Sequence, residues 1–299
     1  MVVVATGFFD GVHRGHKSVI DRVLFYSKAE GMPSGIITFW PHPRAVLQQD
    51  ARMFRLLTSL DEKVDIIKGM GIDGVEVLNF DRDFARQTSE SFFKWAVEER
   101  GVKRLIMGYD HRVGSDIERT QAEIVDMAAN VGLITEVVEP LIDENGVVIS
   151  SSKIRKALSD GSIEEANRML GYRYGLKGVV VEGNMLGRTI GFPTANMELY
   201  EPLKILPDDG VYAVWVEVNG KRYKGISNIG YRPTVDTGSR RTIETHILEF
   251  DEDIYGLALG IEFVSRIRST VKYPSIKALA EQLKADCLQG ERILQTILS

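Results

Sequence analysis

The sequence contains few of the features that mark secreted or membrane proteins. Among its 299 residues there is one cysteine, Cys287, so no disulfide can form within the chain, which fits a reducing compartment. No apolar stretch approaches the roughly 18–20 residues that a membrane-spanning helix needs. The short apolar run at the start follows no basic residue, unlike the usual signal peptide. We therefore expect a cytoplasmic protein that does not act at a membrane.

Basic residues are not in excess either. The chain has 37 lysines and arginines against 42 aspartates and glutamates, a formal net charge of −5, and neither half is basic. A general nucleic-acid-binding surface is therefore disfavoured, and small molecules are the expected partners. The sequence gives no indication of an oligomeric state.

Residues 1–170 alternate short apolar runs with amphipathic stretches. This alternation predicts parallel βαβ units in an open sheet. The predicted strands are 2–5, 35–39, 75–80, 104–107 and 134–138. The predicted helices between them are 17–28, 60–68, 89–99 and 120–130.

Residues 171–299 have a different pattern, with strand-like runs rich in Val, Ile, Tyr and Thr. Asn219-Gly220 lies between two of these runs and is a strong hairpin-turn signal. Gly171 follows a predicted helix over 162–170, where a glycine is a usual helix stop, so we predict a domain boundary there. The fold class is thus an α/β domain, 1–170, followed by an antiparallel β domain, 171–299. The predicted elements of the second domain are strands 176–182, 210–218, 221–226, 242–248 and 260–267 and a helix over 275–288.

Two glycine-rich stretches match nucleotide-binding fingerprints only in their letters. Residues 69–74 read G-x-G-x-x-G, but a predicted helix precedes them and a predicted strand follows, the reverse of a dinucleotide site. Residues 11–18 resemble a phosphate-binding P-loop, but His16 stands between the glycine and the lysine. We interpret the first stretch as a helix-to-strand turn and reject a P-loop for the second.

The segment 6–16 is the first candidate site, because it leaves the first predicted strand and enters a helix. Ligands bind open α/β sheets at this edge. His13 and His16 are three residues apart at the start of the helix and can face one side, where free backbone N–H groups favour anions. These features suit a triphosphate, although histidines here could also serve only as surface or capping residues. The glycines that let a ligand approach the backbone are Gly7, Gly11 and Gly15.

Two further segments could contribute to this site. Residues 149–155, I-S-S-S-K-I-R, precede a short helix, and their serines are candidate helix caps or, with Arg155, ligands for phosphate oxygens. Residues 108–114, G-Y-D-H-R-V-G, follow the fourth predicted strand at the same sheet edge. Either segment could be turn chemistry alone.

The second candidate site follows the first strand of the second half. Residues 183–196 combine three glycines and an arginine with Thr194 and Asn196, whose side-chain oxygens suit Mg²⁺. Glu244 and His246 alternate on a predicted strand and so face one side. Glu244 could be a solvated surface residue, or a general base if a substrate hydroxyl lies beside it.

These motifs together resemble a known family. G-F-F-D-G-V-H-R-G-H, S-S-S-K-I-R and G-Y-D-H-R-V-G, in this order, are similar to the N-terminal module of bacterial bifunctional riboflavin kinase/FAD synthetases, an adenylyltransferase of the HxGH nucleotidyltransferase superfamily. G-R-T-I-G-F-P-T-A-N, with segments 228–234, 244–246 and 254–256, resembles the riboflavin kinase module. The resemblance covers almost the whole chain. It implies a Rossmann-like domain followed by a six-stranded antiparallel β-barrel.

The resemblance also implies two reactions and the residues that perform them. Riboflavin and ATP would give FMN, and FMN and ATP would give FAD and pyrophosphate. His13, His16 and Arg155 would act in adenylyl transfer, Glu244 would be the base of the kinase, and Mg²⁺ would be held by Thr194 and Asn196. Further ATP contacts would come from Gly7, Phe8, Asp10, Gly15, Ser151, Ser152, Gly187, Arg188 and Gly191. Flavin contacts would come from Asp110, Arg112, Asn228 and Arg268.

The chain departs from the family pattern at several positions. Val113 stands where the family usually has an aromatic residue, and the acidic stretch 115–118 replaces a basic, glycine-rich continuation. Ser152 replaces a threonine, and Thr270 stands where a glutamate is frequent. These differences leave three alternatives open: a regulatory protein that binds flavin or nucleotide with a degenerate first site, a riboflavin kinase alone, and an adenylyltransferase for another phosphate acceptor.

Overall fold

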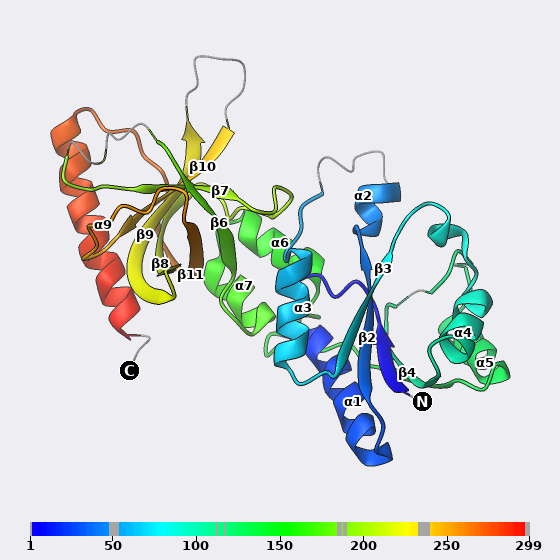
Figure 1. Ribbon diagram of the computed structural model, residues 1–299. Helices are drawn as coiled ribbons and strands as arrows, with labels where there is room; N and C mark the ends of the chain where they lie inside the picture. Colours follow the sequence, from blue (N-terminus) through cyan, green and yellow to red (C-terminus); the bar gives the residue numbers. More distant parts are fainter. Residues whose placement is uncertain are drawn as a thin grey trace. The chain divides into compact units, whose positions relative to one another are not determined.

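The computed structural model describes residues 2–47, 54–111, 113–116, 118–183, 187, 190–232 and 240–296. The chain forms two compact units, Met1–Ser151 and Ser152–Ser299 (Figure 1). In the part of the chain that is described, no helix combines the length and the apolar character required to cross a membrane.

A parallel five-stranded sheet forms the centre of the first unit, in the order β3-β2-β1-β4-β5. Within the sheet, β2 and β3 lie on one side of the central strand β1, and β4 and β5 lie on its other side. The order therefore reverses beside β1, and ligands bind open α/β sheets at such a switch point. The predicted parallel sheet is confirmed. The strands are β1 (Val2–Thr6), β2 (Ser34–Trp40), β3 (Gly74–Asn79), β4 (Val102–Gly108) and β5 (Ile134–Val138).

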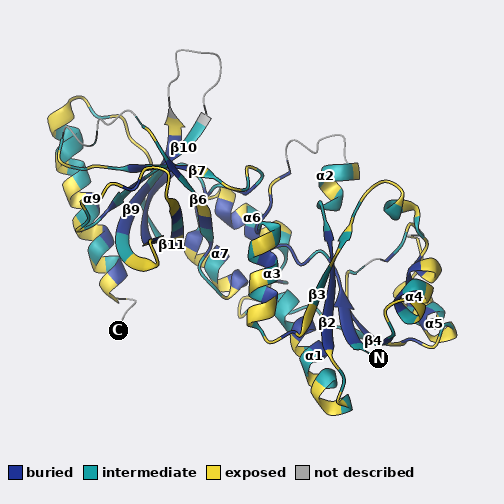
Figure 2. Ribbon diagram, viewed as in Figure 1, coloured by how far each residue is buried: buried dark blue, intermediate teal, exposed yellow. Residues whose placement is uncertain are grey.

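Helices cover both faces of this sheet, so the three central strands are largely buried, whereas the edge strands β3 and β5 are partly exposed (Figure 2). One face packs against α1 (Arg14–Glu30) and α3 (Leu60–Gly69). The other packs against α4 (Ser89–Glu98) and α5 (Gln121–Asn130). Two short helices follow strands at the carboxyl edge, α2 (Pro43–Leu47) and the 3-10 helix η2 (Phe84–Arg86).

The helices of the first unit begin at recognisable caps. The Ser59 side chain and Glu62 form a reciprocal capping box at the start of α3, and Thr120 and Glu123 do the same for α5. Such a box satisfies two of the backbone N–H groups that a helix start leaves free. The glycine stretch 69–74 is a helix-to-strand connection between α3 and β3, as predicted.

The second unit begins with α6 (Ser151–Ser159) and α7 (Ile163–Leu170). Gly171 ends α7 in the left-handed conformation, with φ of 74°, and its N–H bonds the Asn167 carbonyl, so the predicted helix stop is confirmed. The structure groups both helices with the second unit. The proposed start of the second catalytic domain at Gly171 is a separate question and stays a prediction.

A closed antiparallel barrel follows, in the order β10-β7-β6-β11-β8-β9. The six strands that the family resemblance implied are confirmed. Asn219 and Gly220 have φ of 52° and 69°, as the predicted tight hairpin turn requires. The sequence pattern missed β7, which has five residues and only two buried side chains. The strands are β6 (Gly175–Val181), β7 (Ala195–Leu199), β8 (Gly210–Val218), β9 (Lys221–Arg232), β10 (Arg240–Ile247) and β11 (Ala258–Arg268).

The C-terminal helix α9 (Ile276–Thr296) packs on β8, β9 and β11. It continues past the predicted end at 288 because Gly290 lets it approach the barrel closely. A side chain at Gly290 would meet Cδ1 of Ile226 at 2.1 Å. Leu294, one turn later, is completely buried against Trp215 and its neighbours.

Two glycines of the barrel provide a matched test of its packing. A Cβ atom at Gly178 of β6 would lie 2.1 Å from the Glu198 carbonyl oxygen, whereas one at Gly260 of β11 would lie 3.6 Å from Cβ of Glu217. We expect Gly178→Ala to lower the unfolding free energy by about 1–3 kcal/mol and Gly260→Ala to change it by less than about 0.5 kcal/mol. Urea denaturation followed by circular dichroism measures both, and equal effects would contradict this packing.

Candidate functional site

The first candidate site lies where the chain leaves β1, the central strand, and enters α1. The connecting loop has left-handed backbone at Phe9 (φ 49°), Gly11 (φ 82°) and Val12 (φ 34°). Such a backbone is uncommon for residues other than glycine and is strained for valine. The loop is therefore held in its shape by the surrounding structure.

Asp10 supplies much of that support. Its buried carboxylate accepts hydrogen bonds from the backbone N–H groups of Leu57 (3.0 Å) and Thr58 (3.1 Å), and the Thr58 hydroxyl accepts one from the Gly11 N–H (3.0 Å). The Ser151 hydroxyl donates to the Asp10 carbonyl at 2.9 Å. Asp10 and Ser151 thus position the loop, and their ATP contacts stay predictions.

His13 and His16 face the same side, as their spacing predicted. His13 caps α1, with its Nδ1 accepting from the His16 N–H at 3.3 Å, and the two rings stack with centroids 3.6 Å apart. Gly15 makes room for this arrangement, since a Cβ there would lie 3.2 Å from the His13 ring. The Nδ1 atom of His16 is buried and has no hydrogen-bond partner among the described residues.

Lys63 of α3 is a residue of this site that the sequence analysis missed. It is 4% exposed, and its ammonium donates to the Phe8 carbonyl (3.1 Å), the Thr38 hydroxyl (3.0 Å) and the Phe39 carbonyl (3.4 Å). Burial lowers the pKa of Lys63 to about 8, against the opposing effect of Asp10. The one available signal was its position four residues before Ile67, on the buried face of the helix.

The electrostatic potential at this site favours a polyanion even though His16 itself is uncharged. Burial, followed by the electrostatic effects of His13 and Lys63, lowers the pKa of His16 well below its ordinary value. His16 is therefore neutral at pH 7. Positive potential comes instead from the Lys63 ammonium and the amino end of α1, whose free N–H groups attract phosphates.

An aromatic cavity of about 300 Å³ lies on the other side of the loop, beside the face that α4 covers. The Phe8 ring is 5.1 Å from Phe39 and 5.8 Å from Phe80, measured between centroids. Phe8 thus joins two environments, because its carbonyl binds Lys63 and its ring lines the cavity. A flat apolar ligand group fits such walls. The aromatic wall residues are Phe8, Phe39, Phe80, Phe84 and Phe92.

The loop after β4 contributes Val113, which is buried and lines the cavity. Asp110 is exposed and does not line the cavity. Arg112 falls outside the described residues. The flavin contacts predicted for Asp110 and Arg112 stay predictions.

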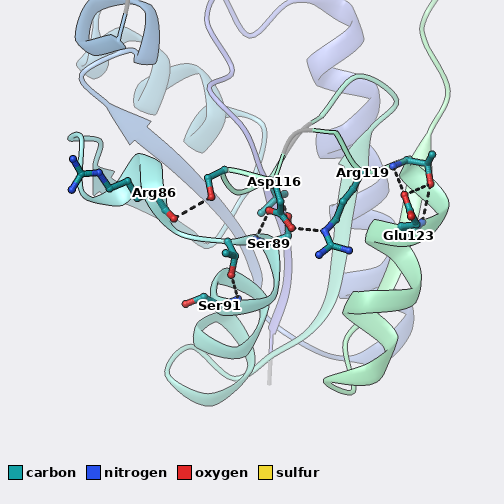
Figure 3. A network of polar contacts seen from close by, with 10 residues as sticks. Arg86, Ser89, Ser91, Asp116, Arg119 and Glu123 are labelled. Atoms are coloured by element: carbon teal, nitrogen blue, oxygen red, sulfur yellow. Dashed lines mark hydrogen bonds and ion pairs between the residues drawn. The ribbon is translucent and has the colours of Figure 1, made fainter.

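Asp116, part of the acidic stretch, is bound by the protein (Figure 3). Its carboxylate accepts from the Ser89 N–H (2.8 Å), the Ser89 hydroxyl (2.7 Å) and Arg119 Nε (2.6 Å). Burial alone would raise the pKa of Asp116, but these hydrogen bonds from Ser89 and Arg119 lower it to about 2. The Asp116 charge of the acidic stretch thus fastens the loop to the start of α4.

Ser152 and Arg155 lie in the first turns of α6 and belong to the second unit. Ser152 is exposed and Arg155 is partly buried. Their participation in the first site stays a prediction.

In the barrel, Glu244 is directly opposite two amide side chains. On β10 it pairs with Asn196 of β7 on one side and with Asn228 of β9 on the other. Directly opposed residues have Cβ atoms roughly 4.5–5.5 Å apart. Because Ile243 and Thr245 are buried, Glu244 lies on the opposite face of the strand. The predicted proximity of Glu244 and Asn196 is confirmed.

The glycine-rich loop before β7 closes on the predicted metal ligands. A Cβ at Gly183 would lie 2.1 Å from the Asn196 amide, and one at Gly187 would lie 3.6 Å from the Thr194 hydroxyl. Gly191 is exposed with φ of 85°, and Arg188 falls outside the described residues. The glycines thus leave Thr194 and Asn196 accessible from the loop.

Thr194 also lines a cavity of about 400 Å³, which segment 250–255 covers. Thr245, on the buried face of β10, lines the same cavity. His246 fastens the loop to β10, with Nδ1 2.7 Å from the Pro193 carbonyl oxygen. Among the described residues, no three His, Cys, Asp or Glu side chains gather in a metal cluster. The assignment of Thr194 and Asn196 as Mg²⁺ ligands stays a prediction, and their neutral oxygens suit that ion.

Arg268, predicted to contact flavin, makes a bidentate ion pair with Asp286 of α9, at 2.8 and 2.6 Å. The hydrogen bonds that Arg268 donates to the Asp286 carboxylate raise the pKa of Arg268. Thr270 lies nearby, since its methyl group is 3.6 Å from where a Cβ of Gly230 would be, and the Asn228 amide is 3.8 Å from the same point. The flavin contacts of Arg268 and Asn228 stay predictions.

Comparisons with known proteins match the two parts of the chain to two different family models. Residues 1–153 match the family model described as FAD synthetase, and residues 170–294 match that described as riboflavin kinase. The chain is 38% identical to the bifunctional riboflavin kinase/FMN adenylyltransferase of Bacillus subtilis, over 99% of this chain and 93% of that protein. The protein of the same description from Listeria monocytogenes is 34% identical, over 95% and 90%. A Streptococcus pneumoniae crystal structure described as a macrolide-efflux protein matches with a TM-score of 0.87 and 33% identity, over 95% and 92%.

The histidines provide a test of the first unit by NMR. Burial lowers the pKa of His111 to about 4 and that of His16 well below its usual value. We expect the His111 ring to stay neutral at about pH 5.5, where an ordinary imidazole is mostly protonated, and the His16 ring to become protonated only at a lower pH than an ordinary imidazole. Because the unfolded chain binds these protons first, the unfolding free energy should fall as the pH decreases from about 6.5 to 4. The ring signals of the five histidines can be assigned by single substitutions, and ordinary titration of His16 and His111 would contradict the burial.

The attachment of Asp116 to α4 makes a second prediction. We expect Asp116→Ala to lower the unfolding free energy by about 1 kcal/mol, the usual effect of removing a helix cap. Glu118→Ala is the matched control, because Glu118 is exposed on the same loop. Urea denaturation of the two variants measures the difference, and a stable Asp116→Ala variant would show that the carboxylate does not fasten the loop.

Proposed function

The chain belongs to the bifunctional riboflavin kinase/FMN adenylyltransferase family, and we propose on that premise that each candidate site performs one of the two reactions. The activities are phosphorylation of riboflavin to FMN and adenylylation of FMN to FAD. We assign the kinase to the barrel and adenylyl transfer to the loop between β1 and α1. The observation that carries this assignment is the position of Glu244, a carboxylate directly opposite Asn196 and beside the glycine-rich loop.

Adenylyl transfer needs positive charge and no base. A phosphate oxygen of FMN, already ionised at pH 7, attacks the α-phosphorus of ATP, and the bond to the pyrophosphate oxygen breaks. Negative charge grows on the α-phosphate and the leaving pyrophosphate. Catalysis then consists of positioning and electrostatic stabilisation. Imidazole N–H groups of His13 and His16, the amino end of α1 and the predicted Arg155 would supply it.

The aromatic cavity is the natural place for the flavin ring. Phe8 belongs to both parts of this site, because Lys63 binds its carbonyl and its ring forms part of the cavity wall. A flavin ring in the cavity and a triphosphate at the start of α1 would therefore meet at one loop. Val113 lines this cavity and Asp116 is bound by Ser89, so the departures that favoured a regulatory protein do not argue against catalysis.

The kinase step needs a base, because its nucleophile is a hydroxyl. Glu244 would accept the proton of the ribityl hydroxyl as that oxygen attacks the γ-phosphorus, and ADP would leave. Asn196 and Asn228 on either side of Glu244 can hold the hydroxyl and the phosphate by hydrogen bonds. Mg²⁺, which fits the oxygens of Thr194 and Asn196, would neutralise phosphate charge when bound. We further assign the protein to the cytoplasm and limit its partners to these small molecules.

The Glu244→Gln variant tests the kinase assignment. Protein supplied with riboflavin, ATP and Mg²⁺ should produce FMN and then FAD, as followed by chromatography. Glu244→Gln should reduce FMN formation by about 10²–10⁴-fold, the usual contribution of a general base, while FAD formation from supplied FMN continues. Glu217→Gln, on an exposed barrel position, is the control. Loss of both reactions in Glu244→Gln would contradict two separate sites.

The complementary variant is His16→Ala. We expect it to reduce FAD formation from FMN by about 10²-fold or more, because a donor to the growing phosphate charge is lost. Riboflavin phosphorylation should stay within twofold of the wild-type rate. Normal FAD formation by His16→Ala would show that His16 takes no part in adenylyl transfer.

A further inference from the structure

Two residues that line the aromatic cavity of the first unit each carry a buried polar atom that has no hydrogen-bond partner among the described residues. The Thr6 hydroxyl and Nε2 of His111 are shut off from solvent and make no hydrogen bond to any described residue. Thr6 is 3% exposed. An unpaired buried polar group is unfavourable, and such groups are rare in native proteins. Two of them in one cavity point to a ligand that completes their hydrogen bonds.

The sheet brings these two residues together. Thr6 ends β1, and His111 follows β4, the neighbouring strand on which Ile106 pairs with Ala5. The His111 N–H bonds the Gly108 carbonyl at 3.0 Å, which fixes the turn that carries the ring. Both residues therefore stand on ordered backbone at the carboxyl edge of the sheet, and both line the cavity.

The other polar side chains of the cavity already have partners within the protein. The Ser115 hydroxyl donates to the Arg86 carbonyl at 3.1 Å, and the Gln87 amide lies 3.5 Å from the Ser91 hydroxyl. The remaining walls are largely aromatic. Among the described wall residues, Thr6 and His111 are thus the ones with a buried side-chain polar atom that lacks a hydrogen-bond partner.

The isoalloxazine ring of a flavin has the matching distribution of polarity. Its dimethylbenzene end is apolar and suits the phenylalanine wall. Its pyrimidine edge carries one N–H donor and two carbonyl acceptors. Burial lowers the pKa of His111 to about 4, so its neutral imidazole offers one N–H and one lone pair at pH 7, and a threonine hydroxyl also donates and accepts.

We propose that His111 and Thr6 hydrogen-bond the pyrimidine edge of the flavin ring and so determine flavin specificity in FMN adenylylation. The proposal rests on the proposed function of the first site and adds the residues that select its substrate. A site built to bond a polar group rejects analogues that lack it, because its own buried atoms are then left unpaired.

The test compares FMN with N3-methyl-FMN, in which the donor of the pyrimidine edge is blocked. FAD formation, or formation of its methylated analogue, is measured with supplied flavin, ATP and the full chain. We expect His111→Phe to raise the KM for FMN by about tenfold, the effect of one hydrogen bond, with kcat within twofold. The wild type should prefer FMN over the analogue, and the preference should shrink in His111→Phe. Thr6→Val should act in the same direction and keeps the test open if His111→Phe fails to fold.

Two further variants separate hydrogen bonding from packing. Phe84→Leu trims the apolar wall of the same cavity, so it should raise the KM of both flavins alike and leave their ratio unchanged. His111→Gln, which keeps a donor and an acceptor, should recover part of the preference. A purely structural role of His111 would make Phe84→Leu and His111→Phe behave alike, which would overturn the proposal.

The outcomes distinguish this proposal from the function on which it rests. If the wild type forms FAD but His111→Phe and Thr6→Val keep its KM and its preference, this proposal fails and the function stands. If only the discrimination against 5-deaza-FMN changes, the contact is to the central ring, and the pyrimidine assignment is wrong. A wild-type protein that makes no FAD would overturn the proposed function, and this proposal with it.

Discussion

The first site depends on a buried ammonium group. Lys63 crosses from α3 to the edge of the sheet and donates to the Phe8 and Phe39 carbonyls and the Thr38 hydroxyl. Burying a charge is unfavourable unless its hydrogen bonds are completed, and these three acceptors complete them. The same contact fixes Phe8 between two environments. One side presents the stacked histidines and the amino end of α1, and the other presents an aromatic cavity.

In the barrel the corresponding constraint is strand register. Glu244 lies opposite Asn196 and Asn228 because β10 pairs with β7 and β9 in one alignment. A shift of one residue would turn every side chain of β10 to the other face, and Glu244 would enter the buried side. The buried residues Ile243, Thr245 and Ile247 make that shift unfavourable. The apolar core thus determines on which face of the strand Glu244 stands.

The sequence predicted what local patterns control and missed what distant contacts control. Alternating apolar runs predicted both fold classes, and the three-residue spacing of His13 and His16 predicted their common side. The strand β7 was missed because only Ala195 and Met197 of its residues are buried. Lys63 escaped notice for another reason, and for the same reason Thr6 and His111 were not singled out within the candidate segments 6–16 and 108–114. Each is important because of atoms from strands or loops far away in the sequence, and its own neighbours in the chain give little sign of this.

The two sites differ in how their carboxylates are bound. In the first unit, Asp10 is bound by backbone N–H groups of residues 57 and 58, and Asp116 by Ser89 and Arg119. Neither charge is left facing an incoming phosphate, and an ionised phosphate nucleophile needs no proton acceptor. A hydroxyl nucleophile does need one, and the barrel provides Glu244 between two neutral amides. Under the assignment proposed above, the unit with the charged nucleophile binds Asp10 and Asp116 within the protein, and the barrel places Glu244 where a hydroxyl nucleophile would need a proton acceptor.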